Sequence, residues 1–273
     1  MGKFDGMLIC TDLDGTLLGS DRKISAENIR AIEYFKSEGG FFTFVTGRMP
    51  FFVSYIAENI NPNAPFGCIN GGGLYDWNKK HYIKKTEMPQ KVSELVRFVY
   101  ETFPHIGIQI NTFDKVFFRR DNRAMADFRK STQVENLVCY GEDVGEPIAK
   151  IVFGIDEEKD VETLANALNT HPLADGFEFI QSEKTLYEIL PKGTNKGAAI
   201  TNLCQYLNVD VHKTIALGDY YNDIPMFEKA GVGVAVANGC ADAVEAADYV
   251  TVSNDENAVS KIISDIECGK LKF

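Results

Sequence analysis

Four aspartates follow two apolar runs that the sequence predicts to be strands. The runs span residues 7–11 and 214–217, and the aspartates that follow them are Asp12, Asp14, Asp219 and Asp223. Residues two apart in an extended chain point to the same side, so Asp12 and Asp14 share one face. If the two strands are neighbours, up to four carboxylates converge on one crevice, where such charges stay ionised only beside a cation. Oxygen ligands of this kind favour Mg²⁺.

Two further positions supply groups that suit a phosphate. Thr46, Gly47 and Arg48 follow the apolar run 41–45 and offer a hydroxyl, an accessible backbone N–H and a guanidinium. Lys196 stands at the start of a predicted helix, where free N–H groups and the helix dipole favour an anion. With Mg²⁺ these groups describe a phosphoryl-transfer site. One carboxylate can attack phosphorus, while its neighbour protonates the leaving oxygen and later activates water.

Alternating strands and helices predict the scaffold that positions these residues. Ser25 is typical of a helix N-cap, and Gly39 and Gly40 of a helix end. We expect strands at 7–11, 41–45, 66–69, 214–217, 232–236 and 249–252, and helices after Ser25 and at 51–58, 196–207, 225–229 and 257–266. Short connections between such elements are the signature of an α/β fold with a Rossmann-like, doubly wound parallel sheet.

Residues 85–191 have a different pattern, because predicted strands come in groups there. We expect strands at 106–110, 116–119, 148–155, 177–181 and 186–190, with helices at 91–102 and 158–168. This pattern predicts an inserted α+β domain, so that residues 1–84 and 192–273 form one discontinuous core. Residues 115–130 carry six basic and two acidic side chains. We interpret them as a solvated face that offsets acidic neighbours; the alternative is recruitment of a second anionic group of the substrate.

The polar segments together resemble a known family. Asp12-Leu13-Asp14-Gly15-Thr16, Thr46-Gly47-Arg48, Lys196 and Gly218-Asp219-Tyr220-Tyr221-Asn222-Asp223 are similar, in order, to all four motifs of the haloacid dehalogenase-like superfamily. The similarity is greatest to the Cof-like sugar-phosphatase branch. Thirty residues between Thr16 and Thr46 leave room for one helix and one strand, whereas 150 residues between Thr46 and Lys196 accommodate a large insert. The insert thus occupies the second cap position, as in that branch.

The resemblance implies a role for each matching residue. Asp12 would be the nucleophile and Asp14 the general acid/base. Mg²⁺ would be held by Asp12, the backbone carbonyl of Asp14, and Asp219, with Asp223 a further ligand or a partner of one. The phosphoryl group would meet Thr46, the amides of Leu13 and Gly47, Lys196 and Asn222, and the substrate side would be lined by Arg48 and Asn70. The insert 85–191 would be a cap that sets substrate specificity.

These features predict a Mg²⁺-dependent phosphatase of small phosphorylated metabolites, sugar phosphates first, that works through an aspartyl phosphate. A phosphomutase or phosphotransferase is the alternative with the same chemistry, in which a second hydroxyl receives the phosphoryl group. A non-catalytic phosphoaspartate receiver or binding module is a further alternative. Asp14 argues against a receiver, which has no use for an acid/base two residues from its acceptor.

Composition excludes several other functions. The 28 basic and 39 acidic residues give a net charge of −11, which disfavours nucleic acid and membrane surfaces as partners. No apolar stretch approaches membrane length, and the first residues lack a signal-peptide core. Six scattered cysteines form no C-x-x-C pair, so we expect free thiols in a reducing cytoplasm rather than disulfides or zinc. The four histidines are dispersed as well, and no pattern indicates an oligomeric state.

Overall fold

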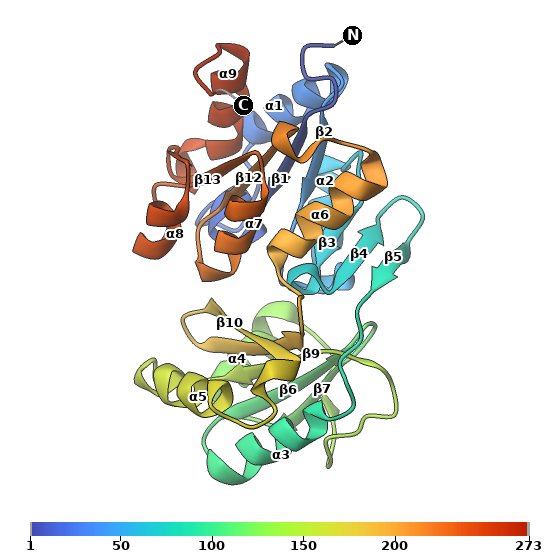
Figure 1. The fold of residues 1–273 in the computed structure, drawn as a ribbon, viewed down its shortest axis with the longest axis vertical. Helices are drawn as coiled ribbons and strands as arrows, with labels where there is room; N and C mark the ends of the chain where they lie inside the picture. Colours follow the sequence, from blue (N-terminus) through green and yellow to red (C-terminus); the bar gives the residue numbers. More distant parts are fainter. Residues whose placement is uncertain (1, 272–273) are drawn as a thin grey trace. The chain divides into compact units, whose positions relative to one another are not determined.

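A computed structural model describes residues 2–271 and divides the chain into two compact units (Figure 1). The core unit comprises Met1–Lys84 and Asn195–Phe273, and the cap unit comprises Lys85–Thr194. The core unit is α/β with a parallel sheet, which confirms the predicted fold class. None of the helices in the described residues is both long enough and apolar enough to cross a membrane.

The sheet of the core unit consists of five parallel strands. Their order across the sheet is β14 (Tyr249–Val250), β13 (Val232–Ala235), β12 (Thr214–Gly218), β1 (Leu8–Thr11) and β2 (Phe41–Phe44). All four residues of β1 are buried, as expected for an apolar strand covered on both faces. Strand β1 pairs directly with β12, so the segments that follow these two strands emerge side by side.

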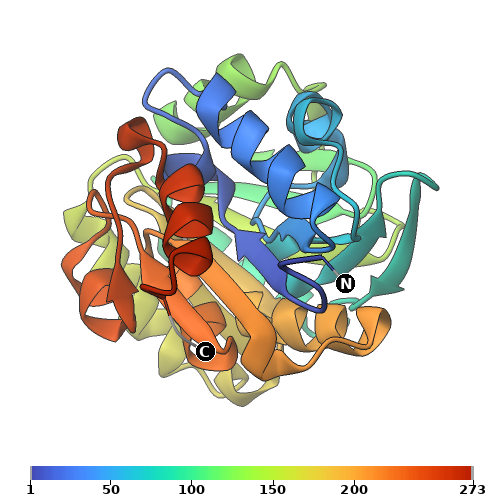
Figure 2. The same ribbon diagram turned by 90° about the horizontal axis from the view of Figure 1, so that it is seen from above.

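Helices cover both faces of this sheet. They are α1 (Ala26–Ser37), α2 (Ser54–Ile60), α6 (Lys196–Leu207), α7 (Ile224–Lys229), α8 (Ala241–Ala246) and α9 (Ala258–Glu267). Helices α1 and α9 pack against each other on one face, and α6 and α7 pack together on the opposite face (Figures 1 and 2). The Ser25 side chain accepts a hydrogen bond from the Asn28 amide, so Ser25 is the predicted N-cap of α1.

The third predicted strand has a different partner from the one a doubly wound sheet suggests. Strand β3 (Phe66–Cys68) pairs antiparallel with β4 (Gly73–Asp76), and β5 (His81–Lys85) completes a separate sheet in the order β3-β4-β5. A single parallel bridge between Val45 and Gly67 joins β3 to the end of β2. The residues after β3 therefore still lie at the carboxyl edge of the core sheet.

The cap unit is a six-stranded sheet with helices. The strand order is β10 (Phe177–Glu183), β11 (Leu186–Pro191), β9 (Ile148–Gly154), β6 (Gly107–Thr112), β7 (Val116–Arg120) and β8 (Leu137–Val138). Helices α3 (Val92–Thr102) and α5 (Lys159–Asn169) pack on its apolar face. Helix α4 (Arg123–Thr132), β8 and α8 were not expected from the sequence; α4 buries only Met125, so its apolar periodicity is weak.

Candidate functional site

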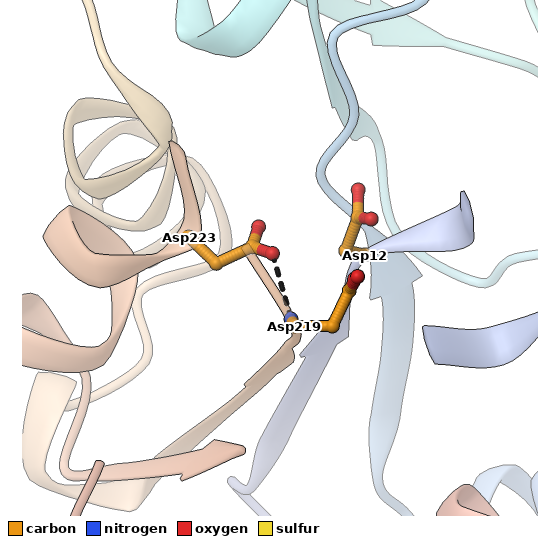
Figure 3. Close-up of side chains that lie close together, drawn as sticks. All are labelled: Asp12, Asp219 and Asp223. Atoms are coloured by element: carbon orange, nitrogen blue, oxygen red, sulfur yellow. Dashed lines mark hydrogen bonds between the residues drawn. The ribbon is translucent and has the colours of Figure 1, made fainter. Parts of the chain in front are cut away.

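The ends of β1 and β12 place Asp12 and Asp219 next to each other (Figure 3). Thr11 is in register with Leu217, and the Asp12 amide donates a 2.8 Å hydrogen bond to the Leu217 carbonyl oxygen. Asp219 follows Gly218, the last residue of β12. The carboxyl end of a parallel sheet is where open α/β folds bind ligands, so these side chains occupy a functional position of the fold.

The turn after β12 fixes Asp223 against Asp219. The Asp223 Oδ2 atom accepts hydrogen bonds from the backbone N–H groups of Asp219 (2.8 Å) and Tyr220 (3.0 Å). Asp223 is fully buried, and a Cβ on Gly218 would lie only 2.4 Å from its Cβ atom. Only glycine at this strand end allows so close an approach. Asp219 and Asp223 are thus held on one rigid turn.

The loop after β1 closes over Asp219 from the other side. Gly15 has a φ of 79°, and a Cβ there would lie 2.5 Å from Asp219 Oδ2, so both conformation and space require glycine. Thr16 Oγ1 donates a 2.8 Å hydrogen bond to Asp219 Oδ1. Sequence reasoning did not assign a role to Thr16, although its position in the segment Asp12–Thr16 was noted. This hydroxyl orients the Asp219 carboxylate.

Three carboxylates converge at this edge. One oxygen each from Asp12, Asp219 and Asp223 lies within 4.8 Å of the other two, in the largest group of possible metal ligands that the described residues contain. Burial raises the pKa of Asp12 well above its usual range, and the charges of Asp223 and Asp219 add to the effect while Lys196 opposes it. Burial, together with the charge of Asp223, raises the pKa of Asp219 to about 7. The surroundings of Asp12 and Asp219 therefore disfavour the ionised form of both carboxyl groups.

Lys196 supplies the ammonium that faces this cluster. It begins α6, whose N-cap Asn195 accepts a hydrogen bond from the Ala198 amide. Its Nζ donates to Asp12 Oδ1 at 2.6 Å and to Asp223 Oδ1 at 2.5 Å, and only 1% of the residue is exposed. Burial lowers the pKa of Lys196, but the two carboxylates raise it more, so the amine stays charged.

The Asp14 carboxylate does not belong to the group formed by Asp12, Asp219 and Asp223. Three of the four aspartates therefore converge on one point, rather than all four. The Asp14 carboxylate receives two hydrogen bonds from the Arg48 guanidinium, from Nε at 2.8 Å and from Nη2 at 2.6 Å. Of the Asp14 side chain, 47% is exposed. Simple alternation of side chains fails here because the chain turns at Leu13–Leu17: Asp14 keeps extended backbone angles (φ −77°, ψ 120°), whereas Gly15 next to it is left-handed at φ 79°.

The remaining predicted residues form a second hydrogen-bonded group. The Thr46 amide donates to the Gly67 carbonyl oxygen, the Asn70 amide donates to the Thr46 carbonyl oxygen, and Asn222 Nδ2 donates to Asn70 Oδ1 at 3.1 Å. Thr46 Oγ1 accepts from the Arg48 amide at 3.2 Å. Within this group Thr46, Asn70 and Asn222 are buried. Leu13, whose amide is predicted to meet the phosphoryl group, is buried as well. The bridge from β2 to β3 thus brings Asn70 beside the turn that carries Asn222.

The sequence of this chain is similar to a known protein family and to individual proteins. A family model of the haloacid dehalogenase-like hydrolases matches residues 9–263. The 5-amino-6-(5-phospho-D-ribitylamino)uracil phosphatase YwtE of Bacillus subtilis is 30% identical over 289 residues, which cover 96% of this chain and 98% of that protein.

Two solved structures have the same fold. A haloacid dehalogenase-like hydrolase from B. subtilis superposes with a TM-score of 0.84 at 24% identity, covering 94% of this chain and 99% of that one. The subclass IIB sugar phosphatase BT4131 superposes with a TM-score of 0.82 at 21% identity, covering 97% and 100% of the two chains. At these identities the likeness shows the fold alone.

Proposed function

Because this chain belongs to the haloacid dehalogenase-like hydrolases, we propose that it is a Mg²⁺-dependent phosphatase of small phosphorylated metabolites, sugar phosphates first. The reaction proceeds through an aspartyl phosphate on Asp12. The observation that carries the proposal is the cluster of Asp12, Asp219 and Asp223, two of which, Asp12 and Asp223, contact the buried ammonium of Lys196. Such a cluster needs further positive charge, which a divalent cation supplies.

The donor set fits Mg²⁺. One ammonium contacts two of the three carboxylates, and burial, to which the neighbouring carboxylates add, raises the pKa values of Asp12 and Asp219. Asp12, Asp219 and the backbone carbonyl of Asp14 would hold the ion, with Asp223 as a further ligand or as the anchor of Asp219. When bound, Mg²⁺ neutralises these carboxylates and the oxygens of a substrate phosphate.

The side chains divide the chemistry between them. The Asp12 carboxylate attacks phosphorus, the bond from phosphorus to the leaving oxygen breaks, and Asp14 gives that oxygen a proton. Asp14 then takes a proton from water, which attacks the phosphorus of the aspartyl phosphate and regenerates Asp12. Asp14 is placed for this exchange because its carboxylate is half-exposed, and proton donation requires that the Arg48 guanidinium releases it, for instance to an oxygen of the substrate.

The phosphoryl group is bound by groups around this pair. We assign this binding to the Leu13 and Gly47 amides, Thr46, Lys196 and Asn222. Arg48 and Asn70 lie on the substrate side. Arg48 donates a hydrogen bond to Asp14, and Asn70 accepts one from Asn222. These contacts with residues that we assign to catalysis and to phosphoryl binding support the placement of Arg48 and Asn70. Residues 85–191 act as the cap that sets specificity, and residues 1–84 with 192–273 as the catalytic core. All six cysteines are free, which supports a cytoplasmic enzyme.

The test is turnover of p-nitrophenyl phosphate with Mg²⁺. Asp12→Asn keeps the shape of the side chain but removes the nucleophile, so we expect the rate to fall by at least about 10⁴-fold while the thermal unfolding transition persists. The matched control is Asp242→Asn, on the exposed surface of α8, which should leave the rate unchanged. An Asp12→Asn variant with undiminished turnover contradicts the mechanism.

A screen of phosphorylated metabolites then ranks substrates by kcat/KM. It should include 5-amino-6-(5-phospho-D-ribitylamino)uracil, the compound in the name of the YwtE relative. Release of inorganic phosphate in the presence of acceptor sugars distinguishes hydrolysis from transfer. Phosphorylated acceptor as the main product would favour the phosphotransferase alternative.

A further inference from the structure

The turn Leu13–Leu17 after β1 has at its centre a residue without a side chain. Gly15 is left-handed at φ 79°, and no other residue type has as wide a choice of backbone conformations. The hydrogen bond that closes the turn runs from the Leu18 amide to the Leu13 carbonyl oxygen at 2.8 Å and does not include Gly15. The conformation of Gly15 therefore depends on contacts from other segments.

One such contact comes from Asn238, in the segment between β13 and α8. Its Nδ2 atom donates a 2.8 Å hydrogen bond to the Gly15 carbonyl oxygen, and its Oδ1 atom accepts one of 2.8 Å from the Asn254 amide. Turning the side-chain amide over would set oxygen against oxygen and N–H against N–H, so a single orientation satisfies both bonds. Asn238 is thus a fixed link between the turn Leu13–Leu17 and the segment of Asn254.

Asn254 holds the loop after β1 at a second point. It begins the short turn Asn254–Glu256 that precedes α9, and its Nδ2 atom donates a 2.9 Å hydrogen bond to the Leu18 carbonyl oxygen. Asn238 and Asn254 together therefore hold the loop at the carbonyl groups of Gly15 and Leu18.

The segment that carries Asn238 also contacts Asp219. The Cys240 amide donates a 2.9 Å hydrogen bond to the Asp219 carbonyl oxygen. Between the two contacts, a Cβ on Gly239 would lie 3.2 Å from that same oxygen. Residues 236–240 therefore contact the turn after β12 directly and, through the Asn238 side chain, the turn after β1.

The two residues next to Gly15 are those on which the proposed reaction depends. Consecutive α-carbons lie only about 3.8 Å apart, so a displacement of Gly15 displaces Asp14 and Thr16 as well. In the proposed function Asp14 supplies a backbone carbonyl for Mg²⁺ and a carboxylate for proton transfer, and Thr16 donates a hydrogen bond to Asp219 Oδ1. The position of Gly15 thus affects how Asp14 and Asp219 are placed relative to each other.

Stability alone does not require an asparagine at position 238. Asn238 is exposed, so water would replace its side chain at the Gly15 carbonyl oxygen and satisfy that oxygen nearly as well. A hydrogen bond of this kind adds little to the free energy of unfolding. Water does not supply a link of fixed length to Asn254 and to the segment that contacts Asp219.

We propose that Asn238 is a positioning residue, which fixes the turn Leu13–Leu17 against the segment that contacts Asp219 and so keeps the groups assigned to Mg²⁺ in one arrangement. Asn254 assists by holding Asn238. The inference rests on the proposed function, which assigns Mg²⁺ to Asp219 and to the backbone carbonyl of Asp14. Asn238 acts through the backbone and takes no part in the reaction itself.

The experiment measures Mg²⁺ binding and turnover in the full-length Asn238→Ala variant. Calorimetric titration of the metal-free protein with Mg²⁺ gives Kd without a substrate, and we expect Kd to rise about fivefold, the size of one lost hydrogen bond. At saturating Mg²⁺, kcat for p-nitrophenyl phosphate should fall about tenfold because the reacting groups are no longer held in place, while KM changes less than about twofold. A structural role alone would lower stability in urea and leave the Kd and kcat of the folded protein as they are.

Two further variants separate positioning from folding. Asn59→Ala removes an exposed asparagine of the same unit, whose Nδ2 atom donates a 2.7 Å hydrogen bond to the Tyr55 carbonyl oxygen, and it should leave Kd and kcat unchanged. Asn238→Asp keeps the acceptor for the Asn254 amide but sets an oxygen against the Gly15 carbonyl oxygen. It carries the test through kcat if Asn238→Ala does not fold.

Two results would overturn the inference. They are a folded Asn238→Ala variant with the Kd of the wild type, and a folded Asn238→Asp variant with the kcat of the wild type. A wild type that binds Mg²⁺ but releases no phosphate overturns the proposed function instead, and the comparison of Kd values still decides whether Asn238 positions the ligands of the ion.

Discussion

The two buried lysines of the described chain have different surroundings. Lys196, in the core unit, contacts Asp12 and Asp223, and Asp219 belongs to the same cluster. Lys150, in the cap unit, has Glu188 as its carboxylate partner. The Lys196 ammonium thus contacts two members of a three-carboxylate cluster, whereas the Lys150 ammonium of the cap unit pairs with Glu188.

This difference distinguishes the carboxylate cluster of the core unit, which further positive charge would stabilise, from the Lys150–Glu188 pair of the cap unit. In the core unit burial raises the pKa values of Asp12 and Asp219, the neighbouring carboxylates raise them further, and a divalent cation would favour the ionised forms. In the cap unit Lys150 pairs with Glu188, and beside them Gln109 Oε1 and Asn111 Nδ2 have no hydrogen-bond partner among the described residues 2–271. The arrangement in the core unit suits a phosphoryl group with its metal.

The largest effect on stability should come from removing either buried lysine. Lys150→Met and Lys196→Met should each lower the free energy of unfolding by about 3–5 kcal/mol, because a buried carboxylate loses its partner. Urea unfolding of the metal-free protein measures both changes. A loss below about 1 kcal/mol in either variant would contradict the burial and pairing described above.

The rescue of these two variants distinguishes the two sites. In the cap unit, Lys150→Met with Glu188→Gln removes both charges, so most of the lost stability should return. In the core unit, Lys196→Met with Asp223→Asn still leaves Asp12 and Asp219 facing each other, and stability should return only when Mg²⁺ is added. Equal rescue of both double variants without Mg²⁺ would remove the distinction between the sites.

Much of the core unit could be predicted because its signals are local. Buried parallel strands are continuous apolar runs, and polar residues directly after them mark the carboxyl edge of the sheet. Strand partners could not be predicted, because hydrophobic periodicity identifies a buried face and not the neighbour that covers it. The 66–69 segment was therefore expected as a strand, but its antiparallel pairing with β4 was not. The turn that takes Asp14 away from Asp12 was hidden for a similar reason, since Gly15 adopts its conformation in contact with Asp219.

The buried polar residues Gln109 and Asn111 of the cap sheet were missed although their signal is present. In the segment 107–112, Gln109 and Asn111 alternate with Ile108 and Ile110, a pattern typical of a strand with one polar face. Such alternation ordinarily indicates solvent. Burial of these residues depends on packing between distant segments, which no local pattern contains. Helix α4 was missed because its helical periodicity involves a single buried residue, Met125.

A smaller effect, about 2–3 kcal/mol, should follow from pH and Mg²⁺. The pKa of Asp219 is about 7 in the folded protein against an ordinary value of 3.8. Between these values the folded state keeps a proton that the unfolded chain has released, so the free energy of unfolding of the metal-free protein should fall as pH rises. Mg²⁺ at one hundred times its Kd should add about 2.7 kcal/mol, and more at pH 8 than at pH 5, because protons compete for the carboxylates.

Thermal unfolding between pH 5 and pH 8, with EDTA and with Mg²⁺, measures the effects of pH and of Mg²⁺ on the free energy of unfolding. Asp219→Asn removes one of the two carboxyl groups whose pKa is raised, the other being that of Asp12, and should reduce the slope of the pH dependence of the metal-free protein. The Lys150–Glu188 pair of the cap unit offers the internal comparison, since Lys150→Met should shift the whole curve without removing its slope. Metal-free stability that rises from pH 5 to pH 7 would contradict the account of the core cluster.

The smallest effect should come from Arg48→Gln. The Arg48–Asp14 pair is bidentate but partly exposed, with 32% and 47% of the two side chains accessible, so solvent and salt screen it. Its loss should cost less than about 1 kcal/mol, and the cost should disappear in 1 M NaCl. Urea unfolding at low and high salt measures the difference. If stability is unchanged while the rate falls, a fall in kcat without a rise in KM would support the proposed role of Arg48 in positioning Asp14, and a rise in KM would support its proposed place on the substrate side. A loss as large as that of Lys196→Met would place this pair with the buried charges and break the contrast between them.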